Sequence, residues 1–338
     1  MKVLWLRPSV GDNISVRRER IAAELEDRGY EVEIRDASGF DAFSAAWRVL
    51  RGDHDVIAGN VRMGMYIGYP LARLVRKPFL GDVSDPITDI DHLPKPLYRF
   101  FGWYETYVLR RADAAVFVYE SSYTKALENG VSEERVARLP NAVDYDAFAE
   151  PDEEAVEEAR GILEDEGVDL NKPVAIYIGG FSENYHVNDI IEAARRTPDW
   201  EFVFVGQGKL ADEVETAANE LGNFYFPGAF EYRLMPGFLA HADVGFCFKD
   251  AEQPLKLKEY GAAGIPAVVQ PGELSKWYDD DELVFVEPEG EEISRVLGRL
   301  KDEEVRAEYG ENLRAVAKEY RWEDIAEEYH KIFQKIAE

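Results

Sequence analysis

Three charged side chains with a chemically useful spacing occur in the segment 254-PLKLKEYGAAGIPAVV-269. On a helix, Lys256 and Glu259 share one face because they are three residues apart, and Tyr260 joins them at four residues from Lys256. A lysine ammonium near a helix start can neutralise a diphosphate, and a carboxylate can accept hydrogen bonds from ribose hydroxyls. The alternative is an ordinary ion pair on a solvated helix, which stabilises by only tenths of a kcal/mol. Lys258 has the weaker case, because it could simply face solvent.

Local signals place this segment on a short helix between two strands. Pro254 suits a first helical turn, where the missing N–H is not needed. Gly264 ends the predicted helix, Pro266 keeps it ended, and the apolar run that follows enters a sheet.

The rest of the chain predicts two α/β halves, because short apolar runs alternate with helical stretches in both. In the first half, strands are predicted at 3–6, 31–36, 55–59, 77–82, 114–119 and 136–140, and helices at 15–30, 65–76, 95–112 and 122–129. In the second half, strands are predicted at 174–180, 201–208, 223–228, 243–248 and 283–287, and helices at 187–196, 209–221, 235–242, 289–300, 302–319 and 322–336. We therefore expect two Rossmann-like domains facing a cleft.

The predicted boundaries follow from composition. Residues 1–150 form the first domain, the charged stretch 151–170 is a linker helix, and residues 171–320 form the second domain. The last helix, 322–338, is expected to pack back on the first domain.

Composition limits the function classes. The 338 residues carry a net charge of −28, with 46% apolar residues, so the chain can form large cores and is a poor candidate for nucleic-acid binding. Acidic residues on nearly every predicted helix favour a protein from a high-salt cytosol over an ordinary acidic surface. The single cysteine, Cys247, excludes a disulfide within the chain, and the five histidines show no metal-ligand spacing.

Two common nucleotide motifs are absent. A dinucleotide fingerprint needs G-x-G-x-x-G after the first strand, but 7-RPSVGDN-13 follows one candidate strand and 179-GGFSENYH-186 the other. The P-loop pattern is missing too. The sequence has no apolar run long enough to span a membrane, so the expected location is cytoplasmic, with the inner membrane face as an alternative.

Four segments together resemble the GT-B glycosyltransferases, most closely glycosyltransferase family 4. They are 112-ADAAVFVYESSYTKALENGVSEERVARLPNAVDYDAF-148, 174-VAIYIGGFSENYHVNDIIEAA-194, the pair EFVFVGQG and NFYFPGAF at 201–208 and 223–230, and the run from 242-ADVGFCF to the opening segment. The resemblance covers residues from about 75 to the end, with the first 75 residues alike only in fold pattern.

This resemblance implies a retaining sugar transfer from a nucleotide-sugar to a hydroxyl acceptor, without a metal or another cofactor. The implied catalytic residues are Asp85, Lys256 and Glu259. The implied donor-binding residues are Gly179, Gly180, Phe230, Asp250, Glu252, Lys258 and Tyr260. Independently, glycines after a strand let backbone N–H groups approach a phosphate, although a plain turn explains them equally well.

The sequence also departs from the family pattern. The family's Glu-x7-Glu motif would place its first glutamate at Ala251, so Asp250 or Glu252 would have to substitute. The usual Arg and Lys on the diphosphate correspond to Gly180 and to Tyr185 or His186. Lys256 would then carry more of the charge neutralisation, or the donor site has decayed.

Candidate acceptor residues come from the first half. Gly11 supplies a turn, and Arg17 with Arg18 could bind an acceptor phosphate, although an ordinary helix face is the favoured interpretation. Asp89-x-Asp91 could be a metal-binding DxD motif, but that motif belongs to a fold with one α/β domain.

Bases and aromatics alternate in 94-PKPLYRFFGWYETYVLRR-111. We favour a core helix buried between sheets, with docking on anionic lipid as the alternative, which a lipid-linked acceptor would strengthen. Two further functions stay open: a sugar-nucleotide 2-epimerase and a non-catalytic partner of another transferase.

Overall fold

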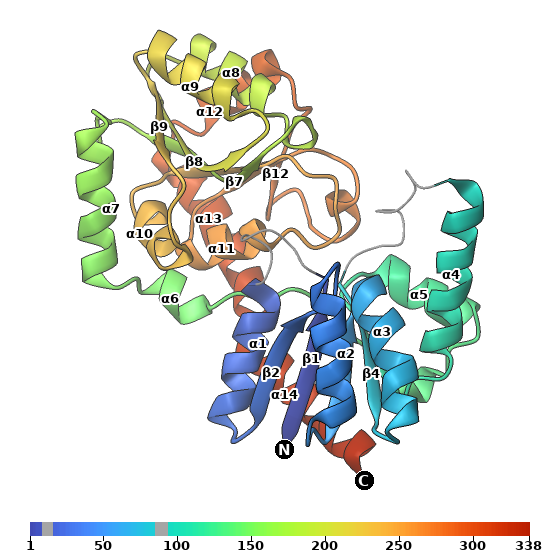
Figure 1. Cartoon of the computed structure of the whole chain (residues 1–338). Coiled ribbons are helices and arrows are strands. Elements are labelled where there is room, and N and C mark those ends of the chain that lie inside the picture. Colours follow the sequence, from blue (N-terminus) through green and yellow to red (C-terminus); the bar gives the residue numbers. More distant parts are fainter. Residues whose placement is uncertain (9–15, 85–93) are drawn as a thin grey trace. The chain divides into compact units, whose positions relative to one another are not determined.

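The chain forms two compact units in a computed structural model that describes residues 1–8, 16–84 and 94–338. The first unit consists of Met1–Asn141 and Trp322–Glu338, and the second of Ala142–Arg321 (Figure 1). The candidate residues Gly11 and Asp85, and the pair Asp89 and Asp91, lie outside the described residues.

The first unit is built on a six-stranded parallel sheet with the order β2-β1-β3-β4-β5-β6. Its strands are β1 (Lys2–Arg7), β2 (Glu31–Asp36), β3 (Val56–Asn60), β4 (Phe79–Val83), β5 (Ala114–Phe117) and β6 (Val136–Arg138). β3 and β4 are buried along their whole length, as expected for central strands covered on both faces.

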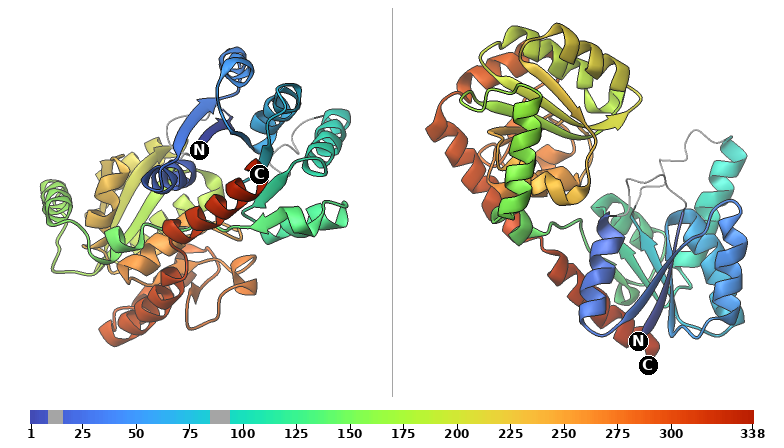
Figure 2. Two further views of the ribbon diagram at one scale, coloured as in Figure 1. Left: turned by 90° about the horizontal axis from the view of Figure 1, so that it is seen from below. Right: turned by 60° about the vertical axis from the view of Figure 1, so that its left-hand side comes forward.

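Helices cover both faces of this sheet. They are α1 (Val16–Asp27), α2 (Asp41–Arg51), α3 (Val61–Leu74), α4 (Lys95–Leu109), α5 (Glu120–Glu128) and α14 (Trp322–Ala337). Right-handed crossovers place α1 on one face and α2, α3 and α4 in series on the other, where α3 packs between α2 and α4. The C-terminal α14 packs beside α1 (Figure 2).

The second unit repeats this arrangement with the strand order β12-β11-β10-β7-β8-β9, again all parallel. Its strands are β7 (Val174–Phe181), β8 (Glu201–Gly208), β9 (Phe224–Gly228), β10 (Val244–Cys247), β11 (Ala267–Val269) and β12 (Val284–Phe285). Its helices are α6 (Tyr145–Ala149), α7 (Glu153–Asp165), α8 (Val187–Arg196), α9 (Ala211–Glu220), α10 (Met235–Leu239), α11 (Leu255–Ala263), α12 (Gly290–Arg299) and α13 (Glu303–Lys318). Two hydrophobic clusters pack against this sheet.

The predicted class, two parallel α/β domains, is confirmed. The segment 151–170, expected as a linker, contributes α7, which packs on α10 inside the second unit. Helix α2 was not predicted. It packs Ala45 and Val49 in the core of the first unit and exposes its larger side chains Phe43 and Trp47.

The chain crosses between the units twice. Inside the second unit, Val143 N donates to Tyr320 O at 2.9 Å, so the outgoing and returning segments lie side by side there. Inside the first unit, the buried Arg17 donates to the carbonyls of Leu139 and Pro140 at 2.8 and 2.7 Å and lies 5.9 Å from the Trp322 ring. Arg17 therefore contacts the chain just before it leaves the first unit, at Leu139 and Pro140, and just where it returns, at Trp322.

None of the helices in the described ranges is long and apolar enough to cross a membrane.

Candidate anion site in the second unit

Helix α11 begins at the carboxyl edge of the second sheet, directly after β10 and its loop. The predicted start and end are confirmed: Pro254 precedes the helix, and Gly264 follows it in the left-handed region at φ 76°. The N–H of Ile265 donates to the carbonyl of Tyr260, which closes the helix end. The first turn of α11 places Lys256 next to the end of β7.

The Lys256 ammonium lies over two aromatic rings. Its Nζ is 4.2 Å from the centre of the Tyr177 ring and 5.0 Å from that of Tyr185. Burial lowers the pKa of Lys256, which indicates that water solvates its charge poorly. Among the described residues, no carboxylate forms an ion pair with this ammonium. Such a lysine would gain from a bound anion.

A second lysine, which sequence reasoning missed, shares this aromatic support. Lys249, in the loop after β10, places its Nζ 5.6 Å from the Tyr185 ring centre, and its charge contributes to the lowered pKa of Lys256. Two ammonium groups around one tyrosine create a local positive field in an acidic chain. The signal in the sequence was the position of Lys249 and Lys256 on either side of one loop. Only the fold brings both lysines to Tyr185.

The last residues of β7 leave space for Lys256. Gly179 has φ 137°, and a Cβ on it would come within 3.0 Å of the Lys256 Nζ. The Tyr177 hydroxyl donates to the carbonyl of Gly180 at 2.6 Å, which fixes this end of the strand. Of the two glycines predicted to bind the donor, Gly179 therefore lies beside Lys256, and Gly180 lies next to the Tyr185 ring.

Glu259 lies one turn further along α11 and is largely buried. Its Oε1 accepts a hydrogen bond of 2.7 Å from the Tyr232 hydroxyl. Tyr232, another residue that sequence reasoning missed, lies in a short turn before α10 and orients the carboxylate. The arrangement provides an acceptor for a hydroxyl on the same helix that carries the ammonium.

Lys258 and Tyr260 point elsewhere. The Lys258 Nζ donates to Gln253 Oε1 at 2.8 Å and lies 4.3 Å from the Tyr320 ring, and its side chain is buried rather than solvent-facing. Tyr260 is fully buried in the core, and its hydroxyl donates to the carbonyl of Phe246. These contacts favour structural roles for both residues.

The two acidic substitutes for the missing glutamate differ in environment. Asp250 is exposed, and its Oδ1 accepts from the backbone N–H of Glu273 at 2.7 Å, so it fixes the loop after β11. Glu252 is buried just before α11.

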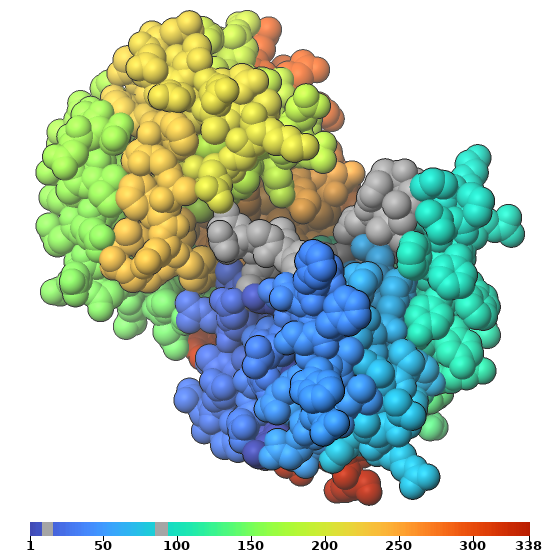
Figure 3. Space-filling view, viewed as in Figure 1, coloured from blue at the N-terminus to red at the C-terminus, as the bar shows by residue number. Residues whose placement is uncertain are grey.

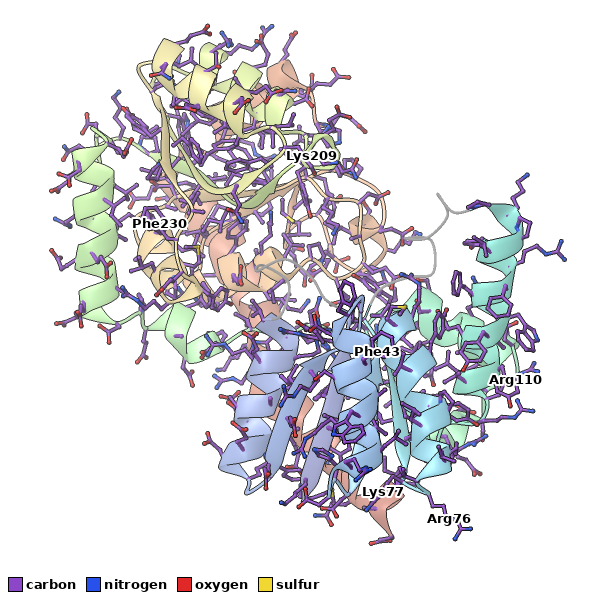
Figure 4. The ribbon with its side chains drawn as sticks, viewed as in Figure 1. Phe43, Arg76, Lys77, Arg110, Lys209 and Phe230 are labelled. Atoms are coloured by element: carbon purple, nitrogen blue, oxygen red, sulfur yellow. The ribbon has the colours of Figure 1, made fainter. Side chains whose placement is uncertain are left out.

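Phe230 is half-buried after β9, with its ring 5.2 Å from that of Phe238 (Figure 4). It packs against the core near α10.

The candidate acceptor arginines are integrated into the first unit. Arg17 holds backbone carbonyls as described, and Arg18, also buried, donates to Asn60 Oδ1 at 2.8 Å. These contacts favour a structural role over phosphate binding.

A buried polar network, not predicted from sequence, lies at the carboxyl ends of β3 and β4. Asn60 donates to Asp82 Oδ2 at 3.2 Å, and the Tyr329 hydroxyl of α14 donates to Asp82 Oδ1 at 3.1 Å. Since Asp82 is completely buried, these hydrogen bonds offset the cost of removing its carboxylate from water.

Within the described ranges, no group of three or more His, Cys, Asp or Glu side chains could hold a metal ion.

Comparison with known proteins agrees with this geometry. Residues 160–324, nearly the whole second unit, match the family model described as glycosyl transferases group 1. The chain is 29% identical over 223 residues to a putative colanic acid biosynthesis glycosyl transferase, WcaI of Escherichia coli, covering 60% of this chain and 54% of that protein. It is 26% identical over 271 residues to the alpha-maltose-1-phosphate synthase of Mycolicibacterium smegmatis, covering 71% and 67%. The chain thus spans about half the length of the first of these relatives.

Solved structures show the same fold over the full length. Anabaena Alr3699/HepE in complex with UDP and glucose superposes with a TM-score of 0.77 at 17% identity, covering 99% of this chain and all of that one. WaaG, a glycosyltransferase involved in lipopolysaccharide biosynthesis, gives 0.67 at 16% identity, covering 98% and 99%. Residues 160–324 therefore resemble the glycosyl transferases group 1 family, and the two units have the α/β fold seen in GT-B glycosyltransferase structures.

Proposed function

We propose that this protein transfers a sugar from a nucleotide-sugar to a hydroxyl acceptor, with retention of the anomeric configuration and without a metal ion. The observation that carries the proposal is the pair Lys249 and Lys256 around Tyr185, at the start of a helix and the end of a parallel strand. Ligands of parallel α/β folds bind at the carboxyl ends of the strands.

The geometry suits a departing diphosphate. Negative charge grows on the leaving group as the sugar bond breaks, so preplaced cations lower the barrier. Tyr177 and Tyr185 cover the Lys256 ammonium and leave it poorly solvated. Its attraction to the diphosphate would therefore be strongest when the negative charge on the leaving group is largest. Where the family usually has an Arg and a Lys, this chain has Gly180 and Tyr185. Lys249 and Lys256 would supply the missing positive charge, so that no metal is required to neutralise the diphosphate.

Glu259 would accept hydrogen bonds from the nucleotide ribose. Its buried carboxylate is oriented by Tyr232 and lies on the same helix as Lys256. Phe230 is proposed near the base, and the backbone at Gly179 and Gly180 near the phosphates. Asp85 remains the proposed contact for the transferred hexose and Gly11 for the acceptor. Relatives named for colanic acid and teichuronic acid biosynthesis support a surface-glycan or lipid-linked acceptor.

The test is calorimetric binding of UDP, GDP and ADP to the full chain and to Glu259→Ala. One nucleotide is expected to bind, and Glu259→Ala is expected to weaken it at least ten-fold, about 1.4 kcal/mol. Lys318→Ala, an exposed lysine at the end of α13, is the matched control and should bind as the wild type does.

The outcomes separate the alternatives. If no nucleotide binds to folded protein, the proposal fails and a non-catalytic partner role replaces it. If one binds, the matching nucleotide-sugars are supplied and the products analysed by NMR. A 2-epimer of the donor identifies an epimerase, whereas transfer with an inverted anomeric centre contradicts retention.

We further propose that this protein works in a high-salt cytosol, because its net charge of −28 is best tolerated there. At about 1 M salt the Debye length falls to about 3 Å, so repulsion among surface carboxylates is screened. Raising KCl from about 0.15 M to 1 M is expected to stabilise the protein by at least about 1 kcal/mol, or 2–4 °C in the thermal midpoint for units of this size. Glucose at matched osmolality is the control, and an unchanged midpoint in KCl argues against the high-salt setting.

A further inference from the structure

The outer surface of α2, α3 and α4 exposes large apolar side chains, including those of α4 that the favoured sequence interpretation buried. That interpretation of residues 94–111 is wrong, since only Val108 and Leu109 of α4 are fully buried. Phe100 and Trp103 of α4 are 52% and 60% exposed, and Phe43 and Trp47 of α2 are 79% and 61% exposed. An apolar residue exposed alone needs no explanation, but aromatics gathered on neighbouring helices indicate a binding surface.

The same surface reverses the charge of the chain. Residues 61–77 and 94–111 together contain eight Lys and Arg and one acidic residue, Glu105, whereas the whole chain has 39 Lys and Arg against 67 Asp and Glu. Outside these two segments the balance is therefore 31 basic to 66 acidic residues. The positive charge is therefore concentrated in the segments that form α3, α4 and the residues next to them.

Several of these cations are available. Arg76 and Lys77 follow α3, and Lys95 and Arg99 lie on the first turns of α4. Among the described residues, none of the four forms an ion pair. Arg110, after α4, projects from the same unit, and Figure 4 labels it with Phe43, Arg76 and Lys77.

A groove of about 480 Å³ lies between α4 and α5. Its lining includes Arg99, Arg110 and Lys125 together with Trp103 and Glu105, and burial raises the pKa of Glu105. Three cations beside a tryptophan suit a phosphate headgroup whose acyl chains lie in an apolar layer.

We propose that this aromatic–cationic face, the exposed surface of α2, α3 and α4 defined by Phe43, Trp47, Phe100, Trp103, Arg76, Lys77, Lys95, Arg99 and Arg110, docks on an anionic lipid bilayer. Aromatic rings enter the headgroup region, where one end meets apolar chains and the other meets water, and the cations pair with lipid phosphates. Figure 3 shows α2 and the helices beside it at the molecular surface. The inference does not depend on the proposed sugar transfer, since it rests on the first unit alone.

The test is flotation of the full-length protein with vesicles of phosphatidylcholine and phosphatidylglycerol in equal amounts, against vesicles of phosphatidylcholine alone. Preferential binding to the anionic vesicles is expected. Phe100→Ser with Trp103→Ser, and separately Arg76→Glu with Lys77→Glu, should each lower the partition coefficient at least ten-fold at about 0.15 M salt. All four positions lie on the surface, so these variants should fold, which thermal unfolding checks.

Salt separates the two contributions. At about 1 M salt, screening should shrink the effect of the charge reversals, whereas the effect of the serine substitutions should persist. Trp277→Ser, an exposed tryptophan in the second unit, is the matched control and should leave binding unchanged.

Three results would overturn the proposal. The first is wild-type protein that does not float with anionic vesicles at either salt concentration, and the second is variants that float as well as the wild type at about 0.15 M salt. The third is a dimer, measured by light scattering, that the serine substitutions abolish while vesicles stay unbound, which would make this face an interface between copies.

Discussion

Replacement of Lys256 by alanine should weaken nucleoside diphosphate binding at least ten-fold, about 1.4 kcal/mol, without destabilising the protein. Its Nζ lies over the rings of Tyr177 and Tyr185, where two phosphates would meet it in a poorly solvated environment. A surface ion pair stabilises far less, because water and salt screen it. Calorimetry of wild type and Lys256→Ala with the nucleotide that binds provides the measurement.

The lowered pKa of Lys256 gives this prediction a pH signature. A bound diphosphate favours the charged lysine, so binding should take up protons as pH rises through the pKa of free Lys256, which burial places below 10.5. Affinity should fall over that range in the wild type and less in Lys256→Ala. Calorimetry in buffers of different ionisation enthalpy measures the proton uptake directly.

The sign for stability is opposite to that for binding. Because the folded pKa of Lys256 lies below its unfolded value, the unfolded chain binds more protons between the two. Stability should therefore rise with pH in that window, and below it the buried charge costs free energy. Lys256→Met should unfold at the same or a higher denaturant concentration while losing the nucleotide. A Lys256 variant that both binds normally and folds normally contradicts the proposed diphosphate contact.

Lys249 provides an internal comparison. It supports the same Tyr185 ring from the exposed side of the loop, so Lys249→Ala removes a cation that water already solvates. Its effect on affinity should be smaller than that of Lys256→Ala. Equal effects would mean that burial of Lys256 contributes nothing to the site.

Much of the fold could be predicted because periodicity and turn residues are local signals. The helix 187–196 and the strand 201–208 were predicted with the observed bounds, and Gly264 ends α11 as expected. Helix α2 was missed because its core face is formed by the small residues Ala45 and Val49, whereas the large apolar residues Phe43 and Trp47 face outward and obscure the pattern. The same surface misled the interpretation of α4.

The site was only partly predictable for a related reason. The spacing of Lys256 and Glu259 on one helix is a local feature, and the structure confirms that helix. Tyr177, Tyr185, Tyr232 and Lys249 come from four other segments, and only the fold brings them to Lys256 and Glu259. Lys258 is adjacent to the site in sequence, but the helical rotation of about 100° per residue turns it to other surroundings. Tyr260 shares the face of Lys256, but its ring is buried in the core and its hydroxyl donates to the carbonyl of Phe246.

Tyr329→Ala should destabilise the first unit by about 3–5 kcal/mol, the usual cost of removing a buried aromatic ring. Tyr329 is fully buried, with its ring 5.3 Å from that of Trp5 and 5.9 Å from that of Phe333. Its loss leaves a cavity between α14 and β1 and removes a donor from the buried Asp82 carboxylate. Urea unfolding followed by tryptophan fluorescence measures the change, and hydrogen exchange in β1 and α14 assigns it to the first unit.

Two variants divide that cost into packing and hydrogen bonding. Tyr329→Phe keeps the ring but leaves Asp82 with a missing donor, so it should cost about 1–3 kcal/mol. Trp103→Ala removes a larger but exposed ring in the same unit and should change stability by less than about 0.5 kcal/mol. If Tyr329→Ala cost no more than Trp103→Ala, α14 would not be packed on the first sheet as described. The chain that returns to the first unit at Trp322 would then not be fixed there by α14, which begins at that residue. A large loss confined to β1 and α14 would instead mean that the last 17 residues, far from β1 in sequence, complete the core of the first unit.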